Sequence, residues 1–88
     1  MSLEFKFETA CIDVKYLTKK PKDDELLRIY GLYKQALFGP NTTKKPQGLL
    51  SIKDQRKWEA WMTFNSLSQE EAKLEYINLV EKLKKQYN

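Results

Sequence analysis

The sequence predicts an all-α protein, a four-helix bundle, and three observations on its 88 residues support this. Apolar residues recur at steps of three and four along most of the chain, which is the period of an amphipathic helix. Proline, glycine and polar turn formers divide this pattern into four segments. No segment alternates apolar and polar residues as a half-buried strand does. A chain of this length normally makes one domain, so we expect a single domain over residues 1–88.

The first expected helix covers residues 3–17 and ends by Lys20, because Pro21 pushes the residue before it out of the helical region. Its apolar face is Phe7, Ala10, Cys11, Val14 and Leu17.

The second expected helix has Asp23 as its N-cap, and the two acids that follow suit the positive end of the helix dipole. It ends at Gly39, since Pro40 cannot continue it. Gly31 lies inside this helix and costs it roughly 1 kcal/mol relative to alanine. The expected apolar stripe is Leu26, Ile29, Tyr30, Tyr33 and Leu37.

Residues 40–50 form the one long connection, with two prolines and a glycine that argue against regular structure. A simple turn between helices is commonly shorter, so we expect this segment to cross the bundle. Two neighbouring helices can then run parallel.

The third expected helix begins with the start signature at residues 51–54 and frays near Asn65. Trp58, Trp61 and Met62 are expected to point inward, and the two tryptophans are most simply interpreted as core residues.

The fourth expected helix begins with a capping box formed by Ser68 and Glu71, and it runs toward Tyr87. Its expected apolar stripe is Ala72, Tyr76, Leu79, Val80 and Leu83.

The composition argues against an enzyme. The chain has no histidine and one cysteine, which excludes a Ser/His/Asp or Cys/His mechanism and argues against a zinc site. Acids cluster at residues 23–25 and 70–71, where helix starts explain them. No glycine-rich phosphate loop is present. We therefore expect no catalytic residues, no metal and no cofactor.

Location and charge give weaker expectations. The lone Cys11 suggests a reducing compartment, and we see neither a secretory signal nor a run of about 18 apolar residues, so we expect a cytoplasmic protein. The formal net charge is +4, with both signs interspersed. Such charge is most often solvated surface, but it permits an anionic partner.

One face of the second helix is unusual, because Tyr30, Tyr33 and Lys34 are neighbours on it. Two phenols and an ammonium make a poor core but a good surface for a planar group and a phosphate. Lys57 lies at the edge of the third helix's buried face, where its ammonium reaches solvent or a phosphate. Taken alone, the tyrosines also fit the rim of a core and Lys57 an ordinary surface lysine.

These residues resemble the acyl-CoA-binding protein family. The resemblance rests on YGLYKQA at 30–36, KWEAW at 57–61, AKLEYINLVEKLKKQY at 72–87 and DVKYLTKKP at 13–21. It covers nearly the whole chain, in order. It implies an up-down-down-up bundle with a long overhand loop between helices 2 and 3. The implied function is non-covalent binding of medium- to long-chain fatty acyl-CoA esters, for intracellular transport and pool maintenance.

The resemblance also implies roles for individual residues. Tyr30, Lys34 and Lys57 would engage the 3′-phosphate of the CoA ribose, and Tyr33 would stack on the adenine. The further nucleotide and phosphate contacts implied are Lys15, Lys53 and Tyr76. The implied acyl groove consists of Leu26 and Leu27, faced by Phe7, Ala10 and Cys11.

Two alternatives remain at this stage, a small helical protein-interaction module and a basic nucleic-acid-binding module. Acids are spread through the chain rather than kept off one face, so we expect no nucleic acid as partner. We expect acyl-CoA esters as partners and a monomer as the oligomeric state. Transient contact with membranes or with enzymes that use acyl-CoA is expected, without stable membrane insertion.

Overall fold

The computed structural model describes residues 2–88, with Leu50 described by its backbone alone, so Met1 of the expected domain lies outside the described residues. Within this range the chain forms four α-helices, two short 3-10 helices and no strand, which confirms the expected all-α class. The 3-10 helices are η1 (Val14–Tyr16) and η2 (Leu49–Ser51). The α-helices are α1 (Leu3–Asp13), α2 (Asp23–Phe38), α3 (Ile52–Thr63) and α4 (Gln69–Tyr87).

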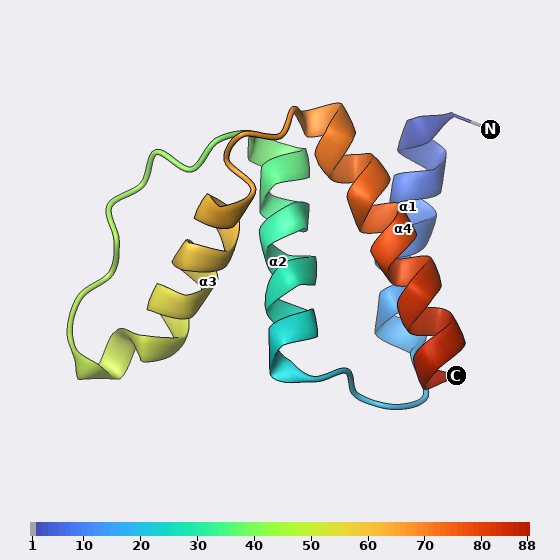
Figure 1. Cartoon of the computed structure of the whole chain (residues 1–88), viewed down its shortest axis with the longest axis horizontal. Coiled ribbons are helices and arrows are strands. Elements are labelled where there is room, and N and C mark those ends of the chain that lie inside the picture. Colours follow the sequence, from blue (N-terminus) through green and yellow to red (C-terminus); the bar gives the residue numbers. More distant parts are fainter. Residues whose placement is uncertain (1) are drawn as a thin grey trace.

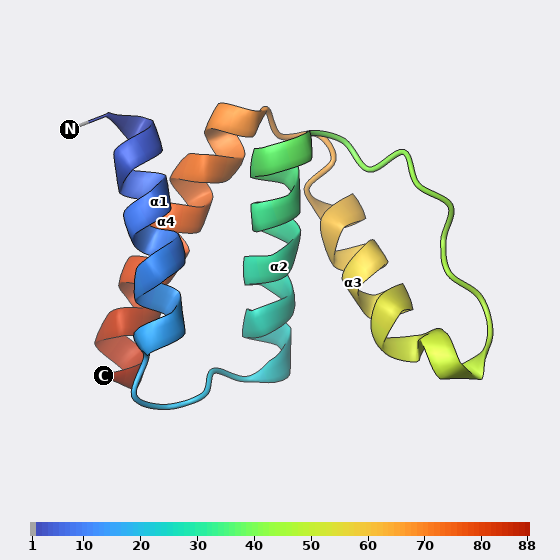
Figure 2. The same ribbon diagram turned by 180° about the vertical axis from the view of Figure 1, so that it is seen from behind.

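The helices lie side by side in a flat molecule that measures 40 × 28 × 16 Å (Figure 1). α2 stands at the centre, with α4 and α1 on one side and α3 on the other, and the view from behind shows the same order (Figure 2). The long connection runs along the outside of α3, so α2 and α3 point in the same direction. α1 and α4 point the opposite way, which is the implied up-down-down-up order.

The core lies where α1, α2 and α4 meet. Every fourth or third residue of α4 faces it, because that spacing returns to one side of a helix. No residue of α3 is fully buried within the described part of the chain. The buried apolar side chains are Phe7, Ala10, Leu32, Ala36, Ala72, Tyr76, Val80 and Leu83.

The stripe expected on α2 is wrong in part. Tyr33 and Leu37 are exposed, whereas Gly31, Leu32 and Gln35 are buried. The physical reason is that α2 packs against α4 on one side and α3 on the other. Two interfaces then bury small and polar residues that a single apolar stripe would leave outside.

One helix end differs from expectation and another agrees with it. The first helix ends at Asp13 rather than Leu17, because the turn Val14–Tyr16 tightens into a 3-10 helix, as helix ends often do. α3 ends at Thr63, close to the fraying expected near Asn65.

The starts of α2 and α4 agree better with those expected from the sequence. The N-cap of α2 is Lys22 rather than Asp23, and the backbone N–H of Lys22 donates to the Glu25 carboxylate at 2.9 Å. The capping box of α4 is confirmed. The Glu71 N–H donates to the Ser68 hydroxyl at 3.0 Å, and the Ser68 N–H donates to the Glu71 carboxylate at 2.9 Å.

The two tryptophans attach the long connection to α3. The indole N–H of Trp58 donates to the Thr43 carbonyl and that of Trp61 to the Gly39 carbonyl, each at 2.9 Å. Both side chains are half-buried, so the expectation that they are core residues is wrong. Among the described α-helices, α3 packs against α2 alone, and the connection covers another side of it. Gly39 ends α2 as expected, with a φ of 74° that favours glycine.

No helix formed by residues 2–88 is long and apolar enough to cross a membrane.

Candidate ligand-binding site

A close approach at Gly31 shapes the space between α2 and α3. A Cβ at this position would lie 2.3 Å from the carbonyl oxygen of Ala60 and 2.9 Å from Cδ2 of Phe64, so only glycine fits. From this point α3 leans away from α2 toward the N-terminal ends of both helices (Figure 1). The glycine that the sequence presents only as a cost to helix stability therefore lets α3 approach α2 closely at this point.

Two adjoining pockets of about 490 and 220 Å³ lie between α2 and α3, and we call them together the α2–α3 groove. Asp23, Leu27 and Arg56 line both pockets, whereas Leu26 and Lys53 line the smaller one only. The remaining lining of the larger pocket is Asp24, Arg28, Glu59, Ala60, Thr63 and Phe64.

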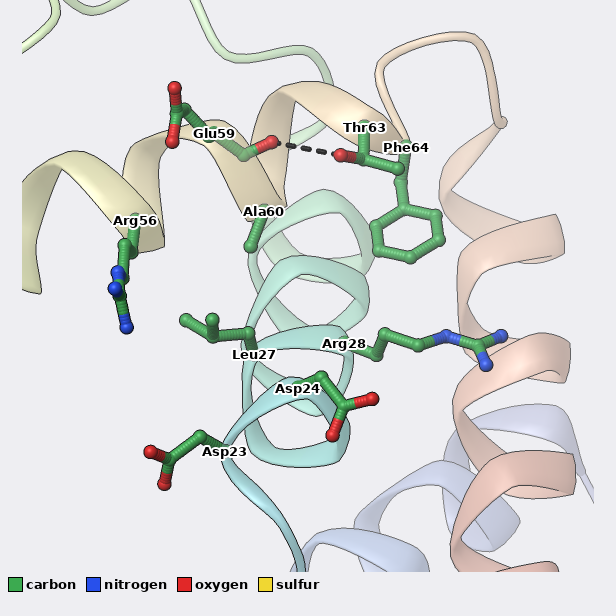
Figure 3. Close-up of a pocket in the computed structure, with 9 residues that line it drawn as sticks. All are labelled: Asp23, Asp24, Leu27, Arg28, Arg56, Glu59, Ala60, Thr63 and Phe64. Atoms are coloured by element: carbon green, nitrogen blue, oxygen red, sulfur yellow. Dashed lines mark hydrogen bonds between the residues drawn. The ribbon is translucent and has the colours of Figure 1, made fainter.

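The groove has an apolar interior and a charged rim (Figure 3). Leu27, Ala60 and Phe64 face the interior from the two helices. The Thr63 hydroxyl donates to the backbone carbonyl of Glu59 at 2.9 Å, so this polar group is satisfied within α3. Such a groove can hold a hydrocarbon chain, and apolar burial is what stabilises it there.

A third pocket, of about 200 Å³, lies between α2, α3 and the long connection, and we call it the basic pocket. Tyr30, Lys34 and Lys57 all line it, so the structure brings these three predicted residues together. Lys57 Nζ lies 5.5 Å and Lys34 Nζ 6.0 Å from the centre of the Tyr30 ring. The other lining residues are Thr43, Lys44, Pro46, Asp54, Trp58 and Trp61.

The basic pocket is positively charged, since three lysines and one aspartate line it. Lys34 Nζ lies 4.5 Å from the ring centre of Phe38 and 5.0 Å from that of Trp61, which are cation–π distances. Among residues 2–88, neither Lys34 nor Lys57 forms an ion pair. The two ammonium groups are therefore free to bind an anion.

Tyr33 faces away from the basic pocket, toward α1 and α4. Its ring centre lies 6.3 Å from that of Phe7 and 6.2 Å from that of Tyr76, and Phe7 and Tyr76 meet edge to face at 5.1 Å. Tyr33 is 38% exposed, whereas the other two rings are almost fully buried. An exposed phenol ring on an aromatic base is a suitable platform for a planar ligand group.

Cys11, Tyr76 and Lys15 lie together beside this platform. The Tyr76 hydroxyl lies beside the Cys11 sulfur. Burial raises the pKa of the Tyr76 phenol, and the contact with Cys11 raises it further. Burial also raises the pKa of the Cys11 thiol, against the lowering effects of Tyr76 and of the Lys15 charge. A half-buried thiol that stays protonated is a poor nucleophile, which argues against a catalytic cysteine.

The residues predicted for the acyl groove are divided between two places. Leu26 and Leu27 line the α2–α3 groove, and Lys53 joins them there rather than in the basic pocket. Phe7 and Ala10 are only 3% and 4% exposed and belong to the core beside α4, as does the half-buried Cys11. The linings of the two groove pockets include none of these three α1 residues.

Arg56 is the main lining residue that the sequence reasoning missed, since it faces both parts of the groove. A signal was present, because Arg56 lies three residues after Lys53 and four before Ala60. Residues at this spacing share one helix face.

Within residues 2–88 no group of three or more Asp, Glu, His or Cys side chains could hold a metal ion.

Comparisons with known proteins agree over most of the chain. The family model described as acyl CoA binding protein matches residues 4–80. An acyl-CoA-binding protein homolog of Drosophila melanogaster is 51% identical over 81 residues, which are 92% of this chain and 93% of that protein. The acyl-CoA-binding protein of Saccharomyces cerevisiae is 48% identical over 82 residues, or 93% of each chain. The crystal structure of Oryza sativa acyl-CoA-binding protein 2 superposes with a TM-score of 0.89 and 39% identity, over 96% of this chain and 90% of that one.

Proposed function

Because this chain belongs to the acyl-CoA-binding protein family, we propose that it binds medium- to long-chain fatty acyl-CoA esters non-covalently, and thereby transports them and maintains an intracellular pool. The observation that carries the proposal is the basic pocket beside the apolar groove, because an acyl-CoA ester combines phosphates with a hydrocarbon chain. The family is one of binding and carrier proteins. We propose no catalytic step and no cofactor.

The basic pocket binds the 3′-phosphate of the CoA ribose in this proposal. Lys34 and Lys57 supply charge, and the Tyr30 hydroxyl supplies a further donor, which together satisfy a phosphate. Support comes from the pocket that these three side chains share and from their lack of ion pairs in the described part of the chain. Lys53 is assigned to the remaining phosphates by the family resemblance alone, since it lines the smaller pocket of the groove and not the basic pocket.

The adenine stacks on Tyr33. Stacking of a base on an aromatic side chain is worth about 1–3 kcal/mol by analogy with nucleic-acid platforms. Lys15 is exposed on η1 and contributes charge beside the nucleotide. Tyr76 is only 2% exposed, so it contributes to nucleotide binding through its contact with Tyr33. Phe7, Ala10 and Cys11 support this surface from α1.

The acyl chain occupies the α2–α3 groove along Leu26 and Leu27. Each buried CH₂ group adds roughly 0.8 kcal/mol, so affinity rises with chain length until the groove is full. CoA without an acyl chain binds more weakly for the same reason.

The setting of the carrier is part of the proposal. We propose a single domain over residues 1–88 that acts as a cytoplasmic monomer. Acyl-CoA esters are its partners, and its contacts with membranes and with enzymes that use acyl-CoA are transient.

Titration calorimetry with palmitoyl-CoA tests the proposal. Lys34→Ala and Tyr30→Phe should each weaken binding by about 1 kcal/mol or more, since each removes a hydrogen bond to a charged group. Lys6→Ala and Tyr16→Phe are matched controls at exposed positions outside the basic pocket. Unchanged affinity in both test variants would show that the phosphate site is wrongly assigned. If neither palmitoyl-CoA nor shorter esters bind or raise the melting temperature, the function itself is wrong.

A further inference from the structure

We propose that Arg56 makes the α2–α3 groove selective for acyl chains that end in a carboxylate, so that ω-carboxy fatty acyl-CoA esters are preferred ligands. The inference rests on the proposed function, because it concerns the far end of the same ligand. It names a residue that sets ligand specificity and the chemical class of chain that the residue recognises.

The position of Arg56 in the groove is the first observation. It lines both pockets, together with Leu27 and Asp23, so a chain that passes from one pocket to the other passes this side chain. Figure 3 shows the guanidinium extending from α3 along the open side of the groove, beyond the apolar interior made by Leu27 and Ala60. A chain that ends at this point therefore meets a cation.

The guanidinium of Arg56 also lacks a partner within residues 2–88. It makes no ion pair and no side-chain hydrogen bond there, although three acids line the groove. Glu59, on the same helix, pairs with Lys45 at 2.9 Å instead. The smaller pocket carries two cations, Lys53 and Arg56, against one acid, Asp23. Lys53 is a phosphate contact in the proposed function, which leaves Arg56 as the cation of this pocket that no other part of the ligand uses.

The chemistry of a guanidinium distinguishes two kinds of chain end. A terminal methyl group packed against Arg56 would remove water from the charge and give nothing in return, which is unfavourable. A terminal carboxylate accepts two parallel hydrogen bonds from the planar guanidinium, and such charge-assisted pairs are strong. A small free anion is a poorer fit, because it would leave the apolar interior unfilled.

Calorimetric titration of two CoA esters of equal chain length tests the inference. The esters are palmitoyl-CoA and hexadecanedioyl-CoA, whose chain ends in a free carboxylate. The measured quantity is the ratio of their dissociation constants for the whole protein, for Arg56→Gln and for Lys6→Gln. Lys6→Gln removes the same charge on α1, outside the groove, and so controls for net charge.

Arg56→Gln should weaken the binding of hexadecanedioyl-CoA about tenfold relative to that of palmitoyl-CoA, which is typical of losing a hydrogen bond between charged groups. The ratio of dissociation constants for Arg56→Lys should lie between those of the natural protein and of Arg56→Gln, because an ammonium keeps the charge but not the paired donors. Lys6→Gln should leave the ratio unchanged. A ratio in Arg56→Gln within about twofold of the natural protein, with both esters bound, would overturn this inference alone. Failure of both esters to bind the natural protein would overturn the proposed function, and this inference with it.

Discussion

The two sides of α2 differ in what they bury. Toward α4, Leu32, Tyr76 and Val80 are at most 2% exposed and fill a continuous core with α1. Toward α3, none of the described residues of the partner helix is buried, and the helices open into the groove beyond Gly31. The side facing α4 stabilises the fold. The side facing α3 leaves apolar surface and unpaired cations available for a ligand.

Truncating one leucine on each side of α2 should give the largest difference between the two sides. Leu32→Ala should lower the free energy of unfolding by about 2–5 kcal/mol, because it leaves a cavity in a closed core. Leu27 is half-buried in the lining of the groove. Leu27→Ala should lower the free energy of unfolding by less than half as much, but it should weaken the binding of palmitoyl-CoA. Urea unfolding and calorimetry measure the two effects. Equal losses of stability would show that both sides contribute alike to the fold.

Adding a methyl group at Gly31 should disturb only the side facing α3. Gly31→Ala should destabilise by about 1–3 kcal/mol through overpacking against Ala60, less the roughly 1 kcal/mol that alanine adds to helix propensity. Hydrogen exchange should then accelerate in α3 more than in α4. Acceleration of similar size in both helices would mean that the two interfaces are coupled.

The smallest expected effect concerns pH and the ends of the helices. Hydrogen bonds from Tyr87 and the Lys22 backbone lower the pKa of Glu25, and those from Ser68 lower the pKa of Glu71. Each group therefore stabilises the fold above the ordinary carboxyl pKa of 4.5. That contribution is lost as pH falls through the lowered value.

Thermal unfolding between pH 7 and pH 3 measures this dependence. Glu25→Gln should flatten it by removing one of the two shifted carboxyl groups. Glu70→Gln, in the first turn of α4, controls for the loss of a negative charge. An unchanged slope in Glu25→Gln would show that its contact with Tyr87 does not contribute to stability.

The sequence predicted the elements of the fold because their ends are local signals. Ser68 with Glu71 and Gly39 with Pro40 mark boundaries through their own side chains or backbone, so neighbours in sequence suffice. The buried face of α2 was not predictable in this way. A helix between two partners hides Gln35 and Ala36 as well as leucines, and which faces meet depends on the distant helices.

The candidate site was predictable only where residues form a known pattern. Tyr30 and Lys34 were identified by their spacing and by the family resemblance, and their roles stay predictions. The role of Gly31 depends on the approach of α3, which no local signal reports. Trp58 and Trp61 were interpreted as core residues because the sequence does not show that the long connection passes over α3. Tertiary structure sets that path, and both indole N–H groups bond to its carbonyls.

The two tryptophans make the protein its own optical reporter. They are the only tryptophans in the chain, and both line the basic pocket, with Lys34 Nζ 5.0 Å from the Trp61 ring centre. A ligand phosphate that draws Lys34 toward itself alters the electrostatic field and the solvent around an indole. Its fluorescence spectrum should change accordingly, so occupancy of this pocket can be followed in the natural protein without a label.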